Sequence, residues 1–185
     1  MSQTNDTTEP VMKFNFSIVQ TRIPSPLGTI ALAATSEGLA GLWFTDNQRY
    51  LPVELTGPTA WPDADGHPVL QQAGRQLAEY FAGRRSRFDL PLDLRCGTHF
   101  QQSVWQALLE IAHGDVISYG EVSRRIGHPA AVRAVGGAIG RNPVSIVVPC
   151  HRVTGTGGAL TGYGGGLDRK TALLRLEGAL AGALA

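Results

Sequence analysis

The sequence predicts an α+β N-terminal domain, formed by an antiparallel sheet plus a helix, followed by a mostly α-helical C-terminal domain with a helix-turn-helix. Three observations predict this class. Short runs rich in β-branched and aromatic residues, separated by turn signals, fill residues 13–44. A helical stripe lies in residues 70–81, and capped helical patterns begin after Gly97. The expected boundaries are a disordered tail at 1–12, an N-terminal domain at 13–93 and a C-terminal domain at 94–180.

Composition excludes several classes of protein. The 185 residues are enough for one large or two small domains, and 43% hydrophobic with 17% charged residues is typical of a folded soluble chain. The apolar runs are too short to cross a bilayer, and the N-terminus lacks the basic and apolar regions of a signal peptide. We therefore expect a cytoplasmic protein with no membrane partner.

The elements of the N-terminal domain follow in order. The runs at 14–20, 29–35 and 38–44 predict a three-stranded meander, because P-S-P-L-G and S-E-G signal turns between them. Residues 45–68, rich in Pro, Asp and Gly, predict a loop, and the helix that follows should end near Gly83. Residues 88–94 alternate in polarity and fit either a last strand or a linker. The aromatic residues here, such as Trp43 and Tyr80, are more typical of a core than of a binding surface.

The C-terminal domain should begin with two capped helices. Thr98 is a candidate N-cap for a helix that Gly114 would end. Ser118, with Glu121 three residues later, predicts a capping box for a short helix at 119–126. A further helix at 132–139 follows a tight turn, which completes the helix-turn-helix outline, and a terminal helix is expected at 168–176.

The second helix of this motif is made of unusually small residues, R-A-V-G-G-A from Arg133. Each glycine costs up to ~1 kcal/mol relative to alanine, which close approach to a flat partner would justify. One arginine is too little for direct major-groove readout but fits a minor-groove approach. The alternative is that the glycines serve packing between helices. The C-terminal half carries eight Lys and Arg against five Asp and Glu, a mild basic excess that fits DNA without requiring it.

The candidate reactive centre is the stretch S-I-V-V-P-C-H-R-V at 145–153. Residues 146–148 predict a buried strand that ends at Pro149 and presents Cys150 and His151. A thiol reacts as thiolate, and an adjacent imidazole can take its proton. Neighbours in an extended chain point to opposite faces, so the pair needs a turn or a bridging water. The alternative is that Cys150 packs as a small buried hydrophobe.

Three further features bear on the chemistry. Residues 154–166 hold seven glycines around Tyr163 but lack the order of a phosphate-binding loop. Glu177 ends a helix, where its charge opposes the helix dipole, and this suggests another role for it. The two cysteines, Cys96 and Cys150, favour a reduced protein over a disulfide framework, and the scattered histidines do not predict a metal site.

Together these motifs resemble the O6-alkylguanine-DNA alkyltransferases, also called methylated-DNA–protein-cysteine methyltransferases, of the bacterial type with a single reactive cysteine. The resemblance covers residues 97–178 in the correct order. It rests on G-T-x-F-Q-x-x-V-W-x-A-L from Gly97, S-Y-G-E from Ser118, R-A-V-G from Arg133, N-P from Asn142, P-C-H-R-V from Pro149, G-Y-x-G-G from Gly162 and R-K-x-x-L-L-x-x-E-G from Arg169.

The resemblance implies direct-reversal DNA repair. Such a protein binds double-stranded DNA through the minor groove as a monomer and flips out O6-alkylguanine, mainly O6-methylguanine and also O4-methylthymine. It transfers the alkyl group irreversibly to its own cysteine in a single turnover, without cofactor or metal. The main alternative is a non-catalytic protein that binds alkylated DNA, and Cys150 argues against it because those relatives carry another residue there. A helix-turn-helix regulator and a thiol hydrolase are further alternatives.

The resemblance also implies roles for individual residues. Cys150 would accept the alkyl group, His151 would take its proton through a water, and Glu177 would hold the imidazole. Tyr119 would donate to guanine N3, and Asn142 would brace the turn behind the thiol. Gly164 stands where some members have a serine, so that only its backbone N–H could reach guanine O6. The implied DNA contacts are Arg133, Ala134, Gly136, Gly137, Arg141 and Ser118, and the implied pocket residues are Tyr119, Val153, Tyr163, Gly164 and Ile139.

Overall fold

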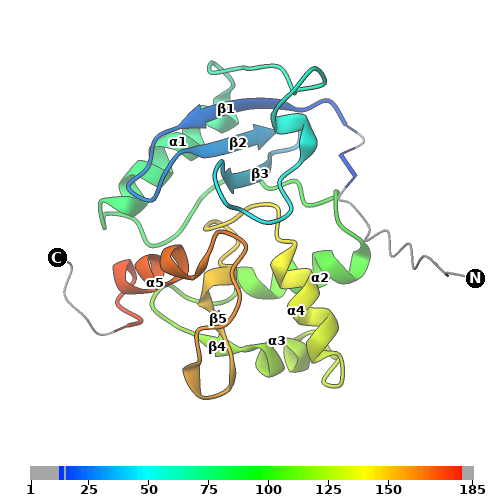
Figure 1. The fold of residues 1–185 in the computed structure, drawn as a ribbon, viewed down its shortest axis with the longest axis vertical. Helices are drawn as coiled ribbons and strands as arrows, with labels where there is room; N and C mark the ends of the chain where they lie inside the picture. Colours follow the sequence, from blue (N-terminus) through cyan, green and yellow to red (C-terminus); the bar gives the residue numbers. More distant parts are fainter. Residues whose placement is uncertain (1–12, 15, 181–185) are drawn as a thin grey trace, which may run out of the picture.

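The computed structural model describes residues 13, 14 and 16–180, so the tail expected at 1–12 lies outside the described residues. A sheet with one long helix forms one half of the molecule, and a group of shorter helices forms the other (Figure 1). The predicted α+β domain followed by a helical domain is confirmed. In the described part of the chain, no helix is long and apolar enough to cross a membrane.

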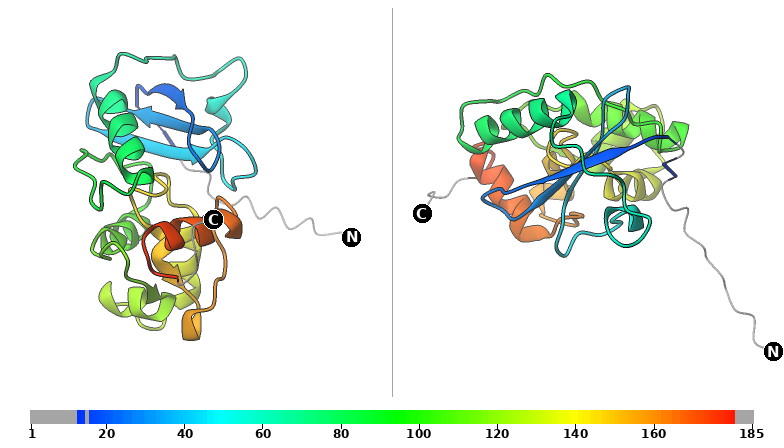
Figure 2. Two further views of the ribbon diagram at one scale, coloured as in Figure 1. Left: turned by 90° about the vertical axis from the view of Figure 1, so that its left-hand side faces the viewer. Right: turned by 90° about the horizontal axis from the view of Figure 1, so that it is seen from above.

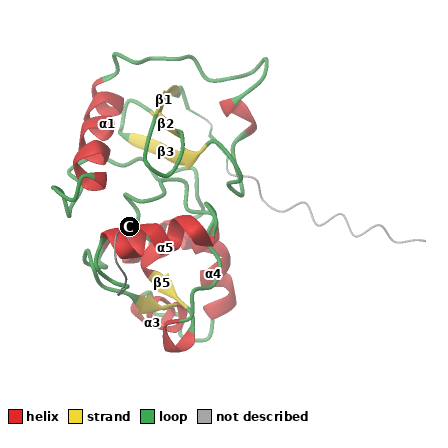
Figure 3. Ribbon diagram, turned by 60° about the vertical axis from the view of Figure 1, so that its left-hand side comes forward, coloured by secondary structure: helices red, strands yellow, loops and turns green. Residues whose placement is uncertain are grey.

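The N-terminal half is built on an antiparallel sheet of β1 (Val19–Ile23), β2 (Ile30–Ala34) and β3 (Leu39–Phe44), paired in that order. Every residue of β2 and β3 is buried, so both faces of the sheet are covered. Helix α1 (Pro68–Phe81) runs along one side of the sheet (Figures 2 and 3). The other cover includes the short 3₁₀ helix η1 (Val53–Leu55) and an aromatic cluster around Trp43.

The segment at 88–94 is a linker and not a strand of the sheet. It meets the sheet at an isolated parallel bridge between Leu39 and Leu92. The Leu39 N–H donates to the Pro91 carbonyl at 2.8 Å, and the Asp93 N–H donates to the Leu39 carbonyl at 2.9 Å. The linker is therefore fixed to the edge of β3 before the chain enters the second half.

The C-terminal half consists of α2 (His99–Leu109), α3 (Tyr119–Arg125), α4 (Val132–Gly140) and α5 (Leu167–Leu176), with a small parallel pair, β4 (Ile117–Ser118) and β5 (Val153–Thr154). Thr98 caps α2 in a full capping box with Gln101. Ser118 caps α3 by accepting from the Glu121 N–H, but the Glu121 carboxylate pairs with two arginines, so only half of the predicted box forms. Helix α2 ends before the predicted Gly114.

The two halves share one hydrophobic core and are tied together at several places, two of which lie at β3. At the first, the Leu42 N–H of β3 donates to the Pro143 carbonyl at 2.9 Å, and Leu42 accepts from the Ser145 N–H at 3.1 Å. At the second, Arg169 of α5 donates to the Asp46 carboxylate at 2.6 Å and lies over the Phe44 ring. The sheet therefore fixes the segment that leads to Cys150.

The buried strand predicted at 146–148 is wrong. The chain turns back on itself there, since the Val148 N–H donates to the Val144 carbonyl at 2.9 Å and Ile146 has a φ of 70°. The Asn142 side chain closes this loop by accepting from the Val144 N–H and donating to the Val148 carbonyl. These side-chain bonds replace strand pairing. The 3₁₀ turn η2 (Cys150–Arg152) follows directly.

Candidate active site

Cys150 lies buried at the start of η2. The Asn142 side-chain amide donates to its sulfur at 3.1 Å and to the Val148 carbonyl at 2.7 Å. Burial raises the pKa of the Cys150 thiol, while the Asn142 hydrogen bond and the charge of Lys170 act in the opposite direction. The resting thiol is therefore protonated at neutral pH, and a base must remove the proton before the sulfur can act as a nucleophile.

His151 has the properties of that base. Its ring is fully buried, and its Nε2 lies 2.8 Å from Glu177 Oε1. Burial lowers the pKa of His151, which leaves a neutral imidazole at pH 7. An ionised carboxylate can only accept, so the network assigns the ring proton to Nε2 and the lone pair to Nδ1. Nδ1 has no hydrogen-bond partner among the described residues.

Glu177 is the centre of a buried cluster. Arg152 donates to both carboxylate oxygens at 2.8 and 2.9 Å, and the Tyr80 hydroxyl donates to Oε1 at 2.7 Å. Burial alone would raise the pKa of Glu177, but the hydrogen bonds with His151 and Arg152 and the charge of Arg152 outweigh it and hold this pKa well below its usual range. The carboxylate is therefore ionised and fixes the imidazole in one tautomer.

A cavity of about 190 Å³ opens beside Cys150. It is bounded by α3, α4 and the glycine-rich loop, and the Tyr119 hydroxyl donates to the Thr161 carbonyl at its edge. Four of the five predicted pocket residues line it, namely Tyr119, Ile139, Tyr163 and Gly164. Val153 does not, because its side chain is fully buried in β5.

Sequence reasoning missed the contribution of the N-terminal domain to this cavity. Arg49 and Tyr50 line it from the loop after β3, and the Arg49 N–H donates to the Gly164 carbonyl at 2.9 Å. The Arg141 guanidinium lies 4.9 Å from the centre of the Tyr50 ring. The loop at 45–68 is rich in Pro, Asp and Gly, and no local signal in its sequence points to this contact. Gly136, Gly137, Gly140 and Gly162 complete the lining.

Lys170 was also missed as a site residue. It is fully buried, and its Nζ donates to the carbonyls of Val153, Thr161 and Gly162 at 2.5, 3.0 and 3.1 Å. The ammonium thus anchors the glycine-rich loop and places a positive charge near Cys150. The signal available in the sequence was the R-K pair that opens the terminal motif.

The predicted DNA-contacting residues gather around α4. Arg133 and Ala134 are exposed at its start, and Gly136 and Gly137 are half-buried. Arg141 follows the helix and donates to the Gly137 carbonyl at 3.3 Å. Ser118 lies elsewhere, at the start of α3, where its hydroxyl serves as the N-cap.

Internal packing does not require the glycines of α4. A Cβ added to Gly136 would lie 3.8 Å from the nearest atom of the Tyr119 ring, and one added to Gly137 would lie 3.5 Å from the Arg141 guanidinium. Both distances are ordinary van der Waals contacts. The alternative that these glycines serve packing between helices therefore loses its support, and close approach of an external partner remains.

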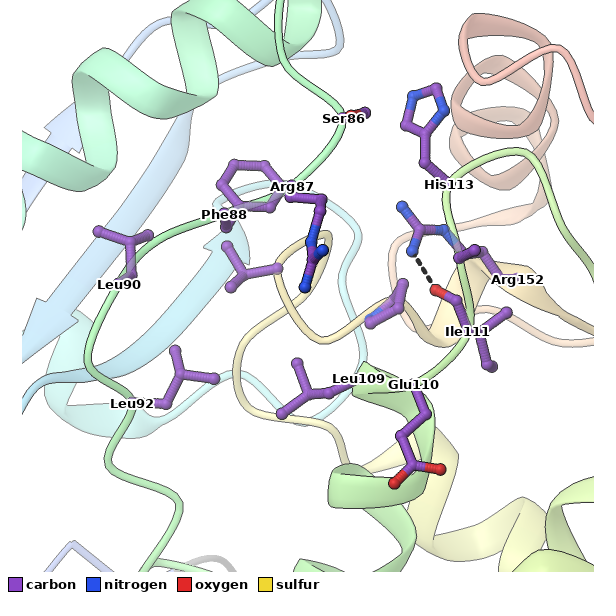
Figure 4. Close-up of a pocket in the computed structure, with 13 residues that line it drawn as sticks. Ser86, Arg87, Phe88, Leu90, Leu92, Leu109, Glu110, Ile111, His113 and Arg152 are labelled. Atoms are coloured by element: carbon purple, nitrogen blue, oxygen red, sulfur yellow. Dashed lines mark hydrogen bonds between the residues drawn. The ribbon is translucent and has the colours of Figure 1, made fainter.

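A second cavity, of about 790 Å³, lies at the junction of the two halves (Figure 4). Leu90 and Leu92 of the linker and Leu109 of α2 line it, and Arg152 reaches across to the Ile111 carbonyl at 2.5 Å. Cys150 does not line this cavity, although Pro149 and Arg152 do. The larger cavity therefore adjoins the Glu177 cluster and not the thiol.

Other reactive groups are few in the described part of the chain. Residues 13–180, apart from 15, contain no group of three or more His, Cys, Asp or Glu side chains that could hold a metal ion. Cys96 is unpaired and buried, and burial raises the pKa of its thiol to about 12. Cys150 lines a cavity and has an imidazole as its sequence neighbour, which makes it the better candidate nucleophile.

Comparisons with known proteins show the family to which the chain is similar. The family model for the DNA-binding domain of 6-O-methylguanine DNA methyltransferase matches residues 99–179, and the model for its ribonuclease-like domain matches residues 18–94. A methylated-DNA–protein-cysteine methyltransferase of Mycolicibacterium paratuberculosis is 51% identical over 84% of this chain and 89% of its own length. A relative of the same name from Methanosarcina acetivorans is 47% identical over 83% of this chain and 94% of its own length. The crystal structure of Mycobacterium tuberculosis OGT in complex with DNA superposes with a TM-score of 0.75 and 48% identity, covering 87% of this chain and 92% of that one.

Proposed function

The chain belongs to the 6-O-methylguanine DNA methyltransferase family, and we propose that it removes alkyl groups from guanine O6 in duplex DNA by transferring them to its own Cys150. Its class of activity is that of a methylated-DNA–protein-cysteine methyltransferase in direct-reversal DNA repair. The observation that carries the proposed site is a buried thiol that opens on a small cavity, next to a neutral imidazole held by a buried carboxylate.

The net result of the proposed reaction is the transfer of one alkyl group from guanine to Cys150 and of one proton from Cys150 to guanine. The Cys150 proton passes through a bridging water to His151 Nδ1, the nitrogen whose lone pair is free. The thiolate attacks the alkyl carbon, so that the S–C bond forms as the C–O6 bond breaks and its electron pair passes to guanine. Tyr119 donates to guanine N3 as this negative charge develops. In the net reaction, the proton lost from the thiol ends on the released guanine. The thioether stays on the protein, so each molecule acts once.

Binding is proposed to occur through α4 in the minor groove. Its small side chains allow close approach to the DNA backbone, and Arg133, exposed near its start, is placed to enter the base stack. Flipping a base costs a few kcal/mol, and an inserted side chain offsets part of this cost. Arg141 and Ala134 extend the same surface. The protein is proposed to bind as a monomer, to accept mainly O6-methylguanine and also O4-methylthymine, and to work in the cytoplasm.

The test is the intact mass of the protein after incubation with a duplex that contains one O6-methylguanine. We expect a stoichiometric gain of one methyl group in the wild-type protein and in Cys96→Ser, which is the matched control for loss of a buried thiol. Cys150→Ser should gain nothing while still binding the duplex. A methyl group found on Cys150→Ser, or none on the wild type, would overturn the proposed acceptor.

The alternative of a non-catalytic protein that binds alkylated DNA is not favoured, because the relatives at 47–51% identity are named as methyltransferases and Cys150 is present. The same experiment separates the two functions. Preferential binding to the lesion without any mass gain in the wild-type protein would identify the lesion-binding function instead.

A further inference from the structure

The N-terminal domain reaches the active-site cluster through one side chain of α1. Tyr80 is almost fully buried, and its hydroxyl donates to Glu177 Oε1 at 2.7 Å. This is the oxygen that His151 Nε2 approaches at 2.8 Å. Tyr80 and Glu177 are 97 positions apart in the sequence, and the bond joins the two domains directly at the group that orients the base.

From this geometry we propose that Tyr80 is a positioning residue for alkyl transfer, which holds Glu177 in place and tunes the basicity of His151. The inference rests on the proposed roles of Cys150 and His151, and it gives the N-terminal domain a part in the chemistry beyond structural support.

The hydroxyl shares the carboxylate oxygen with the imidazole, and this has an electrostatic consequence. A donor on Oε1 takes up part of the negative charge that would otherwise stabilise imidazolium. Arg152 acts in the same direction, since it donates to both oxygens of Glu177. Without the Tyr80 hydroxyl, Oε1 would attract the His151 proton more strongly, the pKa of His151 would rise, and less neutral base would be present near pH 7.

Among the described residues, the charged side chains that act on His151 are Glu177, Arg152 and Lys170. Glu177 lies within hydrogen-bond distance of the His151 ring, and Arg152 donates to Glu177. The charges of Arg152 and Lys170 both lower the pKa of His151. On the far side of Tyr80, the His113 ring lies 6.3 Å away at an angle of 84°, beside the junction cavity shown in Figure 4. Neither Lys170 nor His113 donates to Glu177, so the Tyr80 hydroxyl is the contact through which α1 acts on the carboxylate.

The Tyr80 ring also has a packing role that must be separated from the role of its hydroxyl. It packs against Phe88 of the linker, with ring centroids 5.4 Å apart. Tyr80→Phe removes only the hydroxyl and keeps this contact, while Phe88→Leu alters the contact and keeps the hydroxyl. The two variants therefore form a matched pair.

The experiment measures the single-turnover rate of methyl transfer from an O6-methylguanine duplex against pH, for the wild type and both variants. We expect Tyr80→Phe to lower the rate at pH 7 by a factor of about three to ten, the effect of one hydrogen bond. The acidic limb of its pH profile should move to higher pH, and the chemical shifts of the His151 ring nitrogens should titrate with it. Phe88→Leu should leave the limb where it is.

Each outcome decides one question. A Tyr80→Phe limb that coincides with the wild type, with unchanged His151 shifts, would overturn the positioning role even if the variant were less stable. Equal shifts of the limb in both variants would also overturn it, because packing would then be the cause. Absence of transfer in the wild type would instead reject the proposed function.

Discussion

The loop that carries Cys150 separates two regions of opposite chemical character. On the proposed DNA side, the cavity is lined by five glycines, three tyrosines, Arg49, Ile139 and Cys150, and α4 is rich in glycine and alanine. On the inner side, Glu177, His151, Arg152 and Tyr80 form a buried cluster in which every carboxylate contact is a charged or charge-assisted hydrogen bond. The first region is built mainly of glycines and aromatic rings, and the second is built of polar and charged side chains that bond to one another.

The difference separates two tasks of the site. A pocket that must admit a flipped base and a DNA backbone gains from small residues, which leave space and form few bonds that would have to break. A proton acceptor gains from neighbours that fix its tautomer and its orientation. We expect substitutions in the inner cluster to affect stability and chemistry together, and substitutions on the DNA side to affect binding with little loss of stability.

Glu177→Gln should give the largest effect. It leaves the Arg152 guanidinium buried without its counter-charge, and breaking a buried pair in this way costs about 3–5 kcal/mol of unfolding free energy. The matched control is Glu79→Gln, whose pair with Arg85 is partly exposed to solvent. We expect denaturant unfolding at pH 7 to show a change below about 1 kcal/mol for the control. Similar losses in both variants would remove the distinction between the inner cluster and an ordinary surface pair.

The second-largest expected effect is a loss of stability in acid, caused by protonation of the inner cluster. The pKa of His151 is lowered in the folded protein, so the unfolded chain takes up this proton first, and stability falls as the pH drops below about 6.5. The pKa of Glu177 is also lowered, so its contribution is complete above about 4.3 and is lost as the pH falls further.

Each of these protons changes the unfolding free energy by at most about 1.4 kcal/mol per pH unit. Denaturant unfolding from pH 8 to pH 3 measures the profile, and Glu177→Gln should flatten its lower part. A wild-type profile that stays flat between pH 7 and pH 5 would show that His151 is not held neutral by burial.

Gly136→Ala should give the smallest change in stability. It should also show most clearly that a substitution on the DNA-facing surface affects binding without a loss of stability. A methyl group fits at this position, so the helix should be stabilised by up to about 1 kcal/mol. The same methyl group narrows the cavity and the DNA-facing surface, and affinity for the lesion duplex should fall. Gly120→Ala in α3 is the matched control, since its added Cβ would also make only an ordinary contact. Thermal unfolding and DNA binding measure the two effects, and unchanged affinity in Gly136→Ala would argue against close approach of DNA at α4.

Much of the helical architecture could be predicted because its signals are local. Thr98 and Ser118 cap their helices as expected. The S-E-G turn precedes β3, and α1 ends near Gly83. The glycine-rich loop and the Cys-His pair were also visible as continuous stretches. Such features depend on residues within a few positions of one another, which a sequence displays directly.

The parts that could not be predicted depend on distant residues. The apolar run at 146–148 reads as a strand, but Asn142 bonds it into a turn with Ile146 in the left-handed region. Tyr80 reads as a core aromatic, and only the folded structure shows that its hydroxyl meets Glu177 at the end of α5. The position of Tyr50 could not be predicted either, because its loop is held at the cavity by the backbone bond from Arg49 to Gly164.

The place of α5 in the chain has a consequence for biosynthesis. This last helix delivers Arg169 to the sheet, Lys170 to the glycine-rich loop and, at its end, Glu177 to His151. A nascent chain that has reached Gly166 already contains Cys150 and the whole surface of α3 and α4, but it lacks the carboxylate and both cations. During translation the proposed acceptor thiol and His151 therefore precede the carboxylate that holds the imidazole, and we expect the protein to become competent only when α5 has left the ribosome and docked.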